Sequence, residues 1–305
     1  MVVAAVVAVA VVVAAAAVRD RIISEMEESE IKDFWHTHPC GESLIGGIEQ
    51  FGADYQAFFD NYDKYRYTKE AHILECLKAI DFYGKRTLEI GLGQGADSEQ
   101  IIRQGAKWFG LDLTAESVKR VQIRMKLRDL FYNVTQGSVL AIPYKQKTFD
   151  IVFSHGVLHH VPEILQAQAE IHRVLKPDGE LIVMLYAKNS LNYLFSIGII
   201  RRIGLLGAYL VKKNADGIVG QHLKNAQEKG IWNYLKMDNF IHRNTDGPLN
   251  PYAKVYDIKE VEKDFPLFKI ENVYKKFMHA PPLPVGKLTF EKSLGWHLWV
   301  HLRPR

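Results

Sequence analysis

The sequence predicts an α/β protein built on a doubly wound, mostly parallel sheet. Two observations support this fold class. Short apolar runs typical of strands alternate with segments of helical periodicity between residues 86 and 186. The first run ends in glycines at alternate positions, directly before a helical pattern. Strands that alternate with helices pair in parallel, and ligands bind beyond the carboxyl ends of such strands.

The elements of this core follow one another without long interruptions. They are strands over 86–90, 107–112, 132–137, 149–155 and 180–186, and helices over 96–104, 115–128 and 162–175. The segment 176–179, Lys-Pro-Asp-Gly, is interpreted as a structural turn before the last of these strands. One crevice is expected to collect the residues that stand just past four strand ends: Gly91, Asp112, Ser138 and His155.

The glycine-rich turn reads Glu-Ile-Gly-Leu-Gly-Gln-Gly over residues 89–95. Glycine permits the tight turn and lets a ligand approach the backbone. Free N–H groups at the start of the next helix suit an anionic or polar ligand. The spacing differs from G-x-G-x-x-G, so a dinucleotide site is not indicated. Asp112 ends the following strand, about where a ribose-binding acid belongs.

Four segments stand in a characteristic order: E-I-G-L-G-Q-G (89–95), G-L-D-L (110–113), F-D-I-V-F-S-H-G-V-L-H-H-V (149–161) and R-V-L-K-P-D-G-E-L-I-V (173–183). Together they resemble the class I S-adenosylmethionine-dependent methyltransferases, most closely the group that includes the ubiquinone/menaquinone C-methyltransferases. The resemblance covers roughly residues 85–187. It implies a Rossmann-like, seven-stranded sheet with an antiparallel last strand and S-adenosyl-L-methionine as cofactor.

The resemblance also implies which residues bind the cofactor. They are Glu89, Gly91, Leu92, Gly93, Gly95, Asp112, Leu113, Ser138, Val139 and His155. Asp112 would bind the ribose hydroxyls, and Glu89 would orient the turn or the amine of the cofactor. Ser138 stands where relatives commonly place an acid that faces the adenine, so a charge-assisted hydrogen bond is absent there.

The methyl acceptor is expected between the histidine-rich loop after residue 154 and the segments outside the core. We expect His155 and His159 to be catalytic, although a structural role for each imidazole stays open. A base is required only where the acceptor must lose a proton. The residues expected to bind the acceptor are Trp35, Tyr67, His159 and His242. No metal site is predicted, because His36, His38 and Cys40 lack a fourth ligand at a zinc-like spacing.

The segments outside the core divide the chain further. Residues 19–84 are predicted to form a helical lid, and residues 188–266 an insertion that covers the acceptor. Within the insertion, the apolar stretch 191–211 carries two central arginines, which argue against a membrane-spanning helix. A buried lid helix and an interfacial helix both stay open, and the lid is preferred. Residues 267–305 are expected to supply the last two strands of the sheet.

Residues 1–18 contain only valine and alanine after Met1. As a helix this run would be about 27 Å long, just enough to cross a bilayer core. Valine and alanine are only mildly apolar, and a basic start typical of a signal peptide is missing. The run is therefore interpreted either as a membrane anchor or as a low-complexity tail. The arginines that follow would keep the enzyme on the cytoplasmic side.

Composition limits the classes of binding partner that the protein is expected to have. The net charge of +4 is small for 305 residues and the basic residues are scattered, so nucleic acid is not indicated. Two cysteines are too few for a disulfide framework, which favours a reducing cytoplasm. The leading hypothesis is a cytoplasmic methyltransferase that acts on a small molecule at O, N or C. The alternatives are a membrane-associated lipid or quinone methyltransferase and a catalytically silent S-adenosylmethionine-binding protein.

Overall fold

A computed structural model describes residues 28–211 and 214–305, so the hypotheses on residues 1–18 lie outside the described part. Its centre is one seven-stranded sheet in the order β3-β2-β1-β4-β5-β7-β6. The strands are β1 (Arg86–Ile90), β2 (Lys107–Asp112), β3 (Val134–Gln136), β4 (Phe149–His155), β5 (Leu175–Tyr186), β6 (Phe268–Lys276) and β7 (His297–Pro304). The first five pair in parallel, and β7 runs antiparallel between β5 and β6. The predicted fold class is therefore confirmed.

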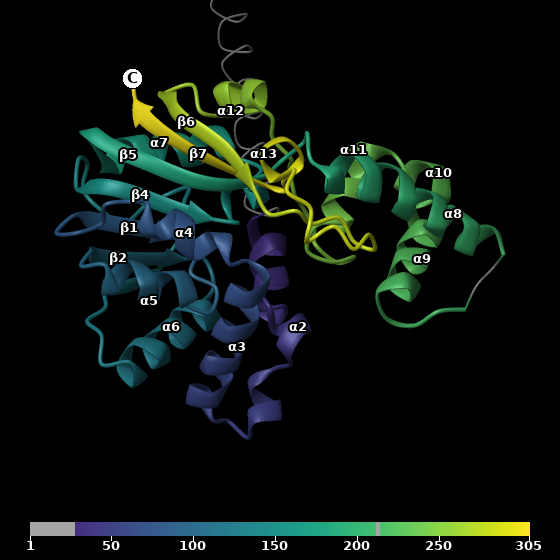
Figure 1. Ribbon diagram of the computed structural model, residues 1–305, viewed down its shortest axis with the longest axis horizontal. Helices are drawn as coiled ribbons and strands as arrows, with labels where there is room; N and C mark the ends of the chain where they lie inside the picture. The colour runs from purple at the N-terminus through teal and green to yellow at the C-terminus, as the bar shows by residue number, and fades with distance from the viewer. Residues whose placement is uncertain (1–27, 212–213) are drawn as a thin grey trace, which may run out of the picture.

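Helices cover both faces of the sheet (Figure 1). One face packs against α7 (Ile164–Val174) and α12 (Ile258–Asp264), and the other against α4 (His72–Lys78), α5 (Ala96–Arg103) and α6 (Ala115–Leu127). Strand β5 shows why both faces are apolar: Leu181, Val183 and Leu185 enter one core cluster, while Ile182 and Met184 enter the other. Successive side chains of a strand point to opposite faces, so a doubly covered strand needs an apolar run rather than alternation.

Side-chain caps fix where several helices begin. The Thr114 hydroxyl accepts a hydrogen bond from the Ser117 amide at 3.3 Å at the start of α6. Asp54 does the same for α3 (Tyr55–Lys69), and Asp257 forms a reciprocal capping box with Glu260 at α12. Each cap satisfies amide groups that lack a partner inside the helix.

Two strand boundaries differ from the predicted ones. Strand β3 is limited to Val134–Gln136. Strand β5 begins at Leu175 rather than at residue 180. Its pairing with β4 jumps from Phe149 opposite Leu175 to Ile151 opposite Glu180, so the Lys-Pro-Asp-Gly segment bulges out between two paired stretches. The local turn chemistry was recognised from the sequence, but the long-range pairing of Leu175 was not.

A helical lobe stands beyond the carboxyl end of β5 (Figure 1). Its elements are η3 (Asn192–Arg201), α8 (Arg202–Leu210), α9 (Gly217–Lys229), α10 (Ile231–Tyr234), α11 (Met237–Phe240) and η4 (Ile241–Arg243). The lobe has its own apolar core, which includes Ile197, Leu223, Tyr234 and Phe240. The chain then returns to the sheet: Tyr256 forms a bridge with Ala187, and α12 packs with the main core.

The helix Asn192–Leu210 is long and apolar enough to cross a membrane by length and composition, and 17% of that window is buried. One side of it faces the lobe, where the Arg201 guanidinium donates to the Asn244 carbonyl at 2.8 Å and to the Pro281 carbonyl at 3.2 Å. The other side is exposed and apolar, with Phe195, Ile199 and Ile203 one turn apart. The stretch is therefore not the buried lid helix that the sequence favoured.

Between residue 28 and β1 the described chain is mostly helical. Residues 28–37 form a helix, followed by α2 (Glu42–Ile45), η1 (Ile48–Phe51) and α3. Helix α3 lies alongside α6, and its buried side chains include Phe58, Phe59 and Tyr62. A short helix, α13 (Glu291–Leu294), precedes β7.

Candidate active site

The glycine turn between β1 and α5 has the backbone that its sequence requires. Gly91 and Gly93 both have positive φ angles, 78° and 51°. A Cβ atom at Gly91 would lie 2.1 Å from a methyl group of Val157, so only glycine lets the turn pack against the loop after β4. A Cβ atom at Gly93 would instead meet the side chain of Cys40, 3.4 Å away. The turn therefore faces the N-terminal lid.

Asp112, at the end of β2, holds this turn in place. One carboxylate oxygen accepts from the Leu92 amide at 2.7 Å, and the other accepts from the Thr114 amide at 2.8 Å and the Thr114 hydroxyl at 2.9 Å. Burial raises the pKa of Asp112 in spite of these hydrogen bonds. The acid thus joins the turn to the start of α6. Its predicted contact with the ribose, with Leu113 beside it, stays a prediction.

Glu89 lies one strand away from Asp112 and is buried. Its Oε2 accepts a hydrogen bond from the Trp108 indole at 2.7 Å. Burial raises the pKa of Glu89 to about 8, and the charge of Asp97 acts in the same direction. A cationic amine beside this carboxyl group would favour its ionised form. The role predicted for Glu89 is compatible with that position.

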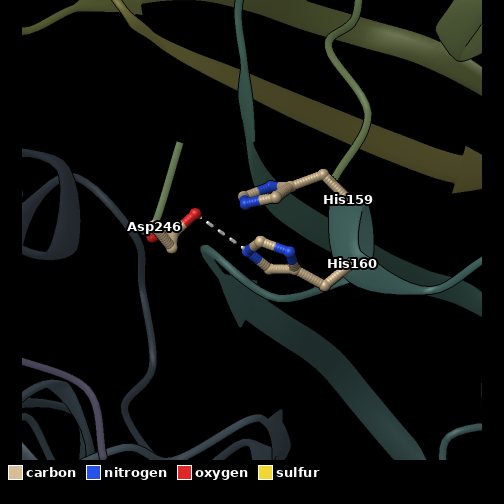
Figure 2. Close-up of side chains that lie close together, drawn as sticks. All are labelled: His159, His160 and Asp246. Atoms are coloured by element: carbon tan, nitrogen blue, oxygen red, sulfur yellow. Dashed lines mark ion pairs between the residues drawn. The ribbon is translucent and has the colours of Figure 1, made fainter. Parts of the chain in front are cut away.

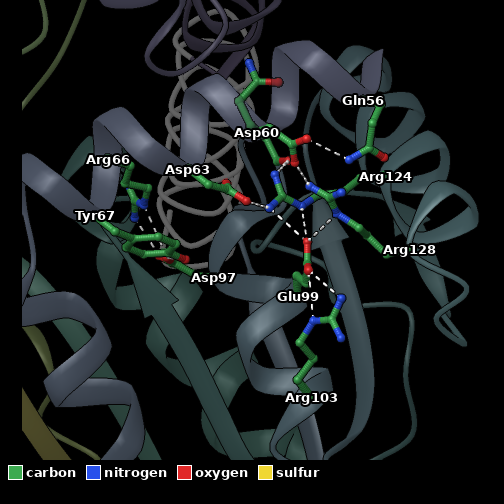
Figure 3. A network of polar contacts seen from close by, with 11 residues as sticks. Gln56, Asp60, Asp63, Arg66, Tyr67, Asp97, Glu99, Arg103, Arg124 and Arg128 are labelled. Atoms are coloured by element: carbon green, nitrogen blue, oxygen red, sulfur yellow. Dashed lines mark hydrogen bonds and ion pairs between the residues drawn. The ribbon is translucent and has the colours of Figure 1, made fainter. Parts of the chain in front are cut away.

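Asp97, in the first turn of α5, is the meeting point of several side chains from distant elements (Figure 3). Arg66 of α3 donates to it through Nη2 at 2.6 Å and Nε at 3.2 Å, and the Tyr67 hydroxyl donates at 3.2 Å. His155 places its Nδ1 3.2 Å from the same carboxylate. Burial opposes ionisation, but the charge of Arg66 and the contact with His155 outweigh it, so the pKa of Asp97 lies far below its ordinary value.

The structure therefore brings His155 and Tyr67 together, but at Asp97. The imidazole of His155 is also tilted against Trp299, with ring centroids 5.2 Å apart. Sequence reasoning missed Asp97, although an acid in the first turn of the helix after the glycine turn was the available signal. His155 and Tyr67 lie on the glycine-turn side of the crevice, where the methionine part of a cofactor is expected.

A second polar group forms where the histidine loop meets the lobe. His159 and His160 follow β4 in the short turn η2 (Leu158–His160), and Asp246 reaches them from the loop after η4 (Figure 2). His160 Nε2 lies 3.3 Å from a carboxylate oxygen of Asp246. The Tyr186 hydroxyl, at the end of β5, donates to the other oxygen at 2.9 Å. The His159 ring lies tilted against that of Tyr186, with ring centroids 3.9 Å apart and an interplanar angle of 33°.

The lid closes this group from the N-terminal side. Trp35 packs edge-on against His160, with ring centroids 5.1 Å apart. Cys40 follows Trp35 in the same segment, and its backbone carbonyl accepts a hydrogen bond from the Gln94 side chain of the glycine turn at 3.3 Å. Trp35 and His159 thus both lie against His160, and their predicted contact with an acceptor stays a prediction. Because Cys40 also neighbours Gly93, this place adjoins the glycine turn.

His242 is placed differently from the prediction. Its Nδ1 lies 2.8 Å from the Ala253 carbonyl and 3.1 Å from the Ala253 amide, and its ring stacks on Tyr252. The imidazole is thus committed to the backbone of its own loop, and Asp246 from that loop stands beside the histidine pair instead. Sequence reasoning singled out His242 from this region and not Asp246.

The expected adenine side lies under the start of the described chain. The Ser138 hydroxyl contacts the carboxylate of Glu28 and accepts from the Leu140 amide at 3.0 Å. Val139 is partly buried against the main core cluster. A carboxylate from the N-terminal segment thus stands beside the Ser138 hydroxyl.

Comparison with known proteins agrees with this geometry. Residues 88–183 match the family described as a methyltransferase domain. The core is a class I S-adenosylmethionine-dependent methyltransferase domain. A solved S-adenosylmethionine-dependent methyltransferase from Mesorhizobium loti has the same fold, with a TM-score of 0.51 and 15% identity, over 77% of this chain and 97% of that one.

Two curated relatives of the methyltransferase domain show the chemical range. The ubiquinone biosynthesis O-methyltransferase of Vibrio cholerae is 30% identical over 127 residues, which is 41% of this chain and 51% of that protein. A phthiotriol/phenolphthiotriol dimycocerosates methyltransferase of Mycobacterium leprae is 32% identical over 104 residues, 33% of this chain and 38% of that protein. The chain therefore spans about half, or less, of the relatives it matches.

The residues of the methyltransferase domain fit the S-adenosyl cofactor. The missing side chains at Gly91 and Gly93 let the backbone of the turn come close to Val157 and to Cys40. Acids stand at the ends of β1 and β2, in Glu89 and Asp112, and a hydroxyl follows β3 in Ser138. These groups match an amine, a ribose and an adenine in the order in which the cofactor carries them.

Proposed function

We propose that the protein transfers the methyl group of S-adenosyl-L-methionine to a small-molecule acceptor. The observation that carries the proposal is the meeting of two groups at the carboxyl ends of the parallel strands. The glycine turn with Asp112 would hold the cofactor, and the group of His159, His160 and Asp246 includes two histidines that come shortly after Val157, whose side chain packs against Gly91. A donor site and an acceptor site in contact are what an in-line displacement requires.

The chain's own residues position the reactants and exclude water. When bound, the cofactor supplies a methyl group on a positively charged sulfur, so the leaving group is already activated. The lid residue Trp35 and the strand-end residue Tyr186 border the acceptor side with aromatic rings. Aromatic faces stabilise a nearby cation by about 0.5–2 kcal/mol. His159 has no hydrogen-bond partner on either ring nitrogen, so its imidazole is available to an acceptor hydroxyl.

Calorimetry and a turnover assay test the proposal. The protein should bind S-adenosylhomocysteine in the low-micromolar range and bind NAD more weakly. Incubation with methyl-labelled S-adenosylmethionine and a panel of phenols, amines and acidic carbon compounds should label at least one acceptor class. Tighter binding of NAD would refute the cofactor assignment. Binding without labelling of any acceptor would favour the silent cofactor-binding protein instead.

A membrane-associated subtype is the second candidate, because of the lobe surface. Phe195, Ile199, Ile203 and Leu210 form an exposed stripe along the helix Asn192–Leu210. Beside it lies an apolar groove of about 390 Å³, whose lining includes Trp232, Arg202 and Lys236 but no acid. Apolar residues with tryptophan and basic neighbours are typical of a helix that lies in the membrane interface. A lipid-soluble acceptor would then enter from the bilayer.

Vesicle sedimentation distinguishes the two candidates. The protein lacking residues 1–18 should sediment with anionic phospholipid vesicles, and the double substitution Ile199→Ser/Ile203→Ser should abolish this. The same exchange at exposed Leu165 and Leu127, on α7 and α6, is the matched control. Equal sedimentation of all variants would remove the lobe as a membrane surface.

We also propose a cytoplasmic location, where the free Cys40 and Cys76 stay reduced.

A further inference from the structure

Four ring and carboxylate atoms at the meeting of the histidine loop and the lobe lack hydrogen bonds. They are both ring nitrogens of His159, Nε2 of His160 and Oδ2 of Asp246. His159 is fully buried and His160 is 3% exposed. Buried polar atoms without a partner are rare, because each loses its hydrogen bonds to water and gains none in the protein. One ligand atom from each residue lies within 4.8 Å of the others, so a single group could satisfy all three side chains.

The hydrogen bond on the far side of His160 decides which atoms face that group. Its Nδ1 lies 2.7 Å from the Tyr252 carbonyl, which can only accept, so Nδ1 carries the proton. A neutral His160 then points the lone pair of Nε2 at the Asp246 carboxylate, 3.3 Å away. Two lone pairs at this distance repel each other. A proton on Nε2 or a cation between the two atoms removes the repulsion.

His159 favours the cation over the proton. Its ring is fully buried beside that of His160, with ring centroids 4.4 Å apart, and both of its nitrogens lack a partner. A proton on His160 would leave the nitrogens of His159 without partners. A cation would be bound by one of them as well. Figure 2 shows both rings with nitrogen atoms on the side of Asp246.

We propose that His159, His160 and Asp246 bind one divalent transition-metal ion of the zinc class. Two imidazoles and one carboxylate are the donors that such ions prefer, whereas magnesium and calcium prefer oxygen alone. Metal–ligand bonds of about 2.0–2.2 Å in a tetrahedral site place ligand atoms roughly 3.4 Å apart. The 3.3 Å between His160 Nε2 and Asp246 Oδ2 already meets this, and His159 needs a small approach.

The surroundings of these three ligands support the same conclusion. A metal-binding imidazole usually donates its other N–H to a carbonyl or carboxylate, as His160 does to Tyr252. The Tyr186 hydroxyl fixes the second oxygen of Asp246. The Asp246 side chain is 23% exposed, which leaves a path for the ion.

The ion would define the acceptor class, an inference that rests on the proposed methyltransferase function. Three protein ligands leave a coordination position open. An acceptor hydroxyl bound there has a lowered pKa, and its proton passes to water. The oxygen then bonds to the methyl carbon while the carbon–sulfur bond breaks and its electron pair stays on sulfur, which yields the methyl ether and S-adenosylhomocysteine. The acceptor is thus a hydroxyl compound, and His159 acts as a ligand rather than a free base.

Metal uptake tests the site without any acceptor. The full chain, stripped with a chelator, is titrated with Zn²⁺ by calorimetry and with Co²⁺ by visible absorption. We expect one ion per chain, ligand-field bands of a four- or five-coordinate ion, and loss of both in His159→Ala and Asp246→Asn. Tyr186→Phe should weaken binding by about 10–100-fold. His301→Gln, which removes a histidine bound to Glu180 at the other side of the sheet, should change nothing.

The variants separate the metal site from the proposed function. Asp246→Asn changes one atom at a partly exposed side chain, so it should stay folded even where His159→Ala does not. Equal metal binding by Asp246→Asn and the unaltered protein would overturn the inference. Binding of S-adenosylhomocysteine should persist in Asp246→Asn. If neither the unaltered protein nor any variant binds S-adenosylhomocysteine, the methyltransferase proposal is refuted and the metal site still stands.

Discussion

Replacement of Asp112 by alanine should separate cofactor binding from simple structural support. The substitution removes the acceptor of three hydrogen bonds, from the Leu92 amide and from the amide and hydroxyl of Thr114. A hydrogen bond to a charged group contributes about 1.5–3 kcal/mol. We therefore expect the affinity for S-adenosylhomocysteine to fall by about 1.5–3 kcal/mol, or roughly 10–150-fold. Part of this loss reflects the ribose contact and part the released glycine turn.

Asp150→Ala is the matched control, because Asp150 also accepts a backbone amide, that of Arg86 at 2.9 Å, but at the amino end of the sheet. Both variants are measured by calorimetry with S-adenosylhomocysteine and by thermal unfolding. We expect both to lower the melting temperature and only Asp112→Ala to weaken binding. Asp112→Asn should also weaken binding, because its amide group must point a donor at either Leu92 or Thr114. Unchanged affinity in Asp112→Ala would refute the cofactor role and leave Asp112 a structural residue.

Three further predictions concern stability. Arg124→Ala should lower the free energy of unfolding in urea by about 3–5 kcal/mol, because this fully buried guanidinium pairs with Glu99 at 2.9 Å. Arg103 pairs with the same acid but its side chain is 48% exposed, so Arg103→Ala should lower that free energy by only about 0–1 kcal/mol. Equal losses in the two variants would contradict the burial argument. Burial raises the pKa of Glu89 from 4.5 to about 8. Between these pH values the folded chain keeps a proton that the unfolded chain releases. The contribution of Glu89 therefore lowers the free energy of unfolding as the pH rises from about 4.5 to 8. In that pH range the free energy of unfolding of Glu89→Gln, relative to that of the unaltered protein, should rise by about 1.4 kcal/mol per pH unit. A difference that does not change with pH would show that Glu89 is ionised in the folded protein. A chain that begins at Arg19 should keep its melting temperature and cofactor affinity, and a drop of more than about 4 °C would show that residues 1–18 pack onto the body.

The sequence by itself determined the sheet and the glycine turn. Strands β1, β2 and β4 begin and end at the predicted residues, because strand length, glycine and helix caps act over a few neighbouring positions. The parallel order follows from the alternation of strands and helices. Glycine is the residue type that readily adopts the positive φ angles found at Gly91 and Gly93. These local signals were enough to place the proposed cofactor site.

Only the tertiary structure decided the acceptor side. Arg66 and Asp97 are 31 residues apart in the chain, and Tyr186 and Asp246 are 60 apart. No local pattern links such pairs, since they meet only when helix α3 docks on the core and the lobe loop folds back. That loop is held by Arg201 and by His242, not by its own propensity. The His242 side chain is hydrogen-bonded to the backbone inside the lobe, so it does not reach the histidine pair. In the described part of the chain, Asp246 has no such backbone contact and faces His160 instead.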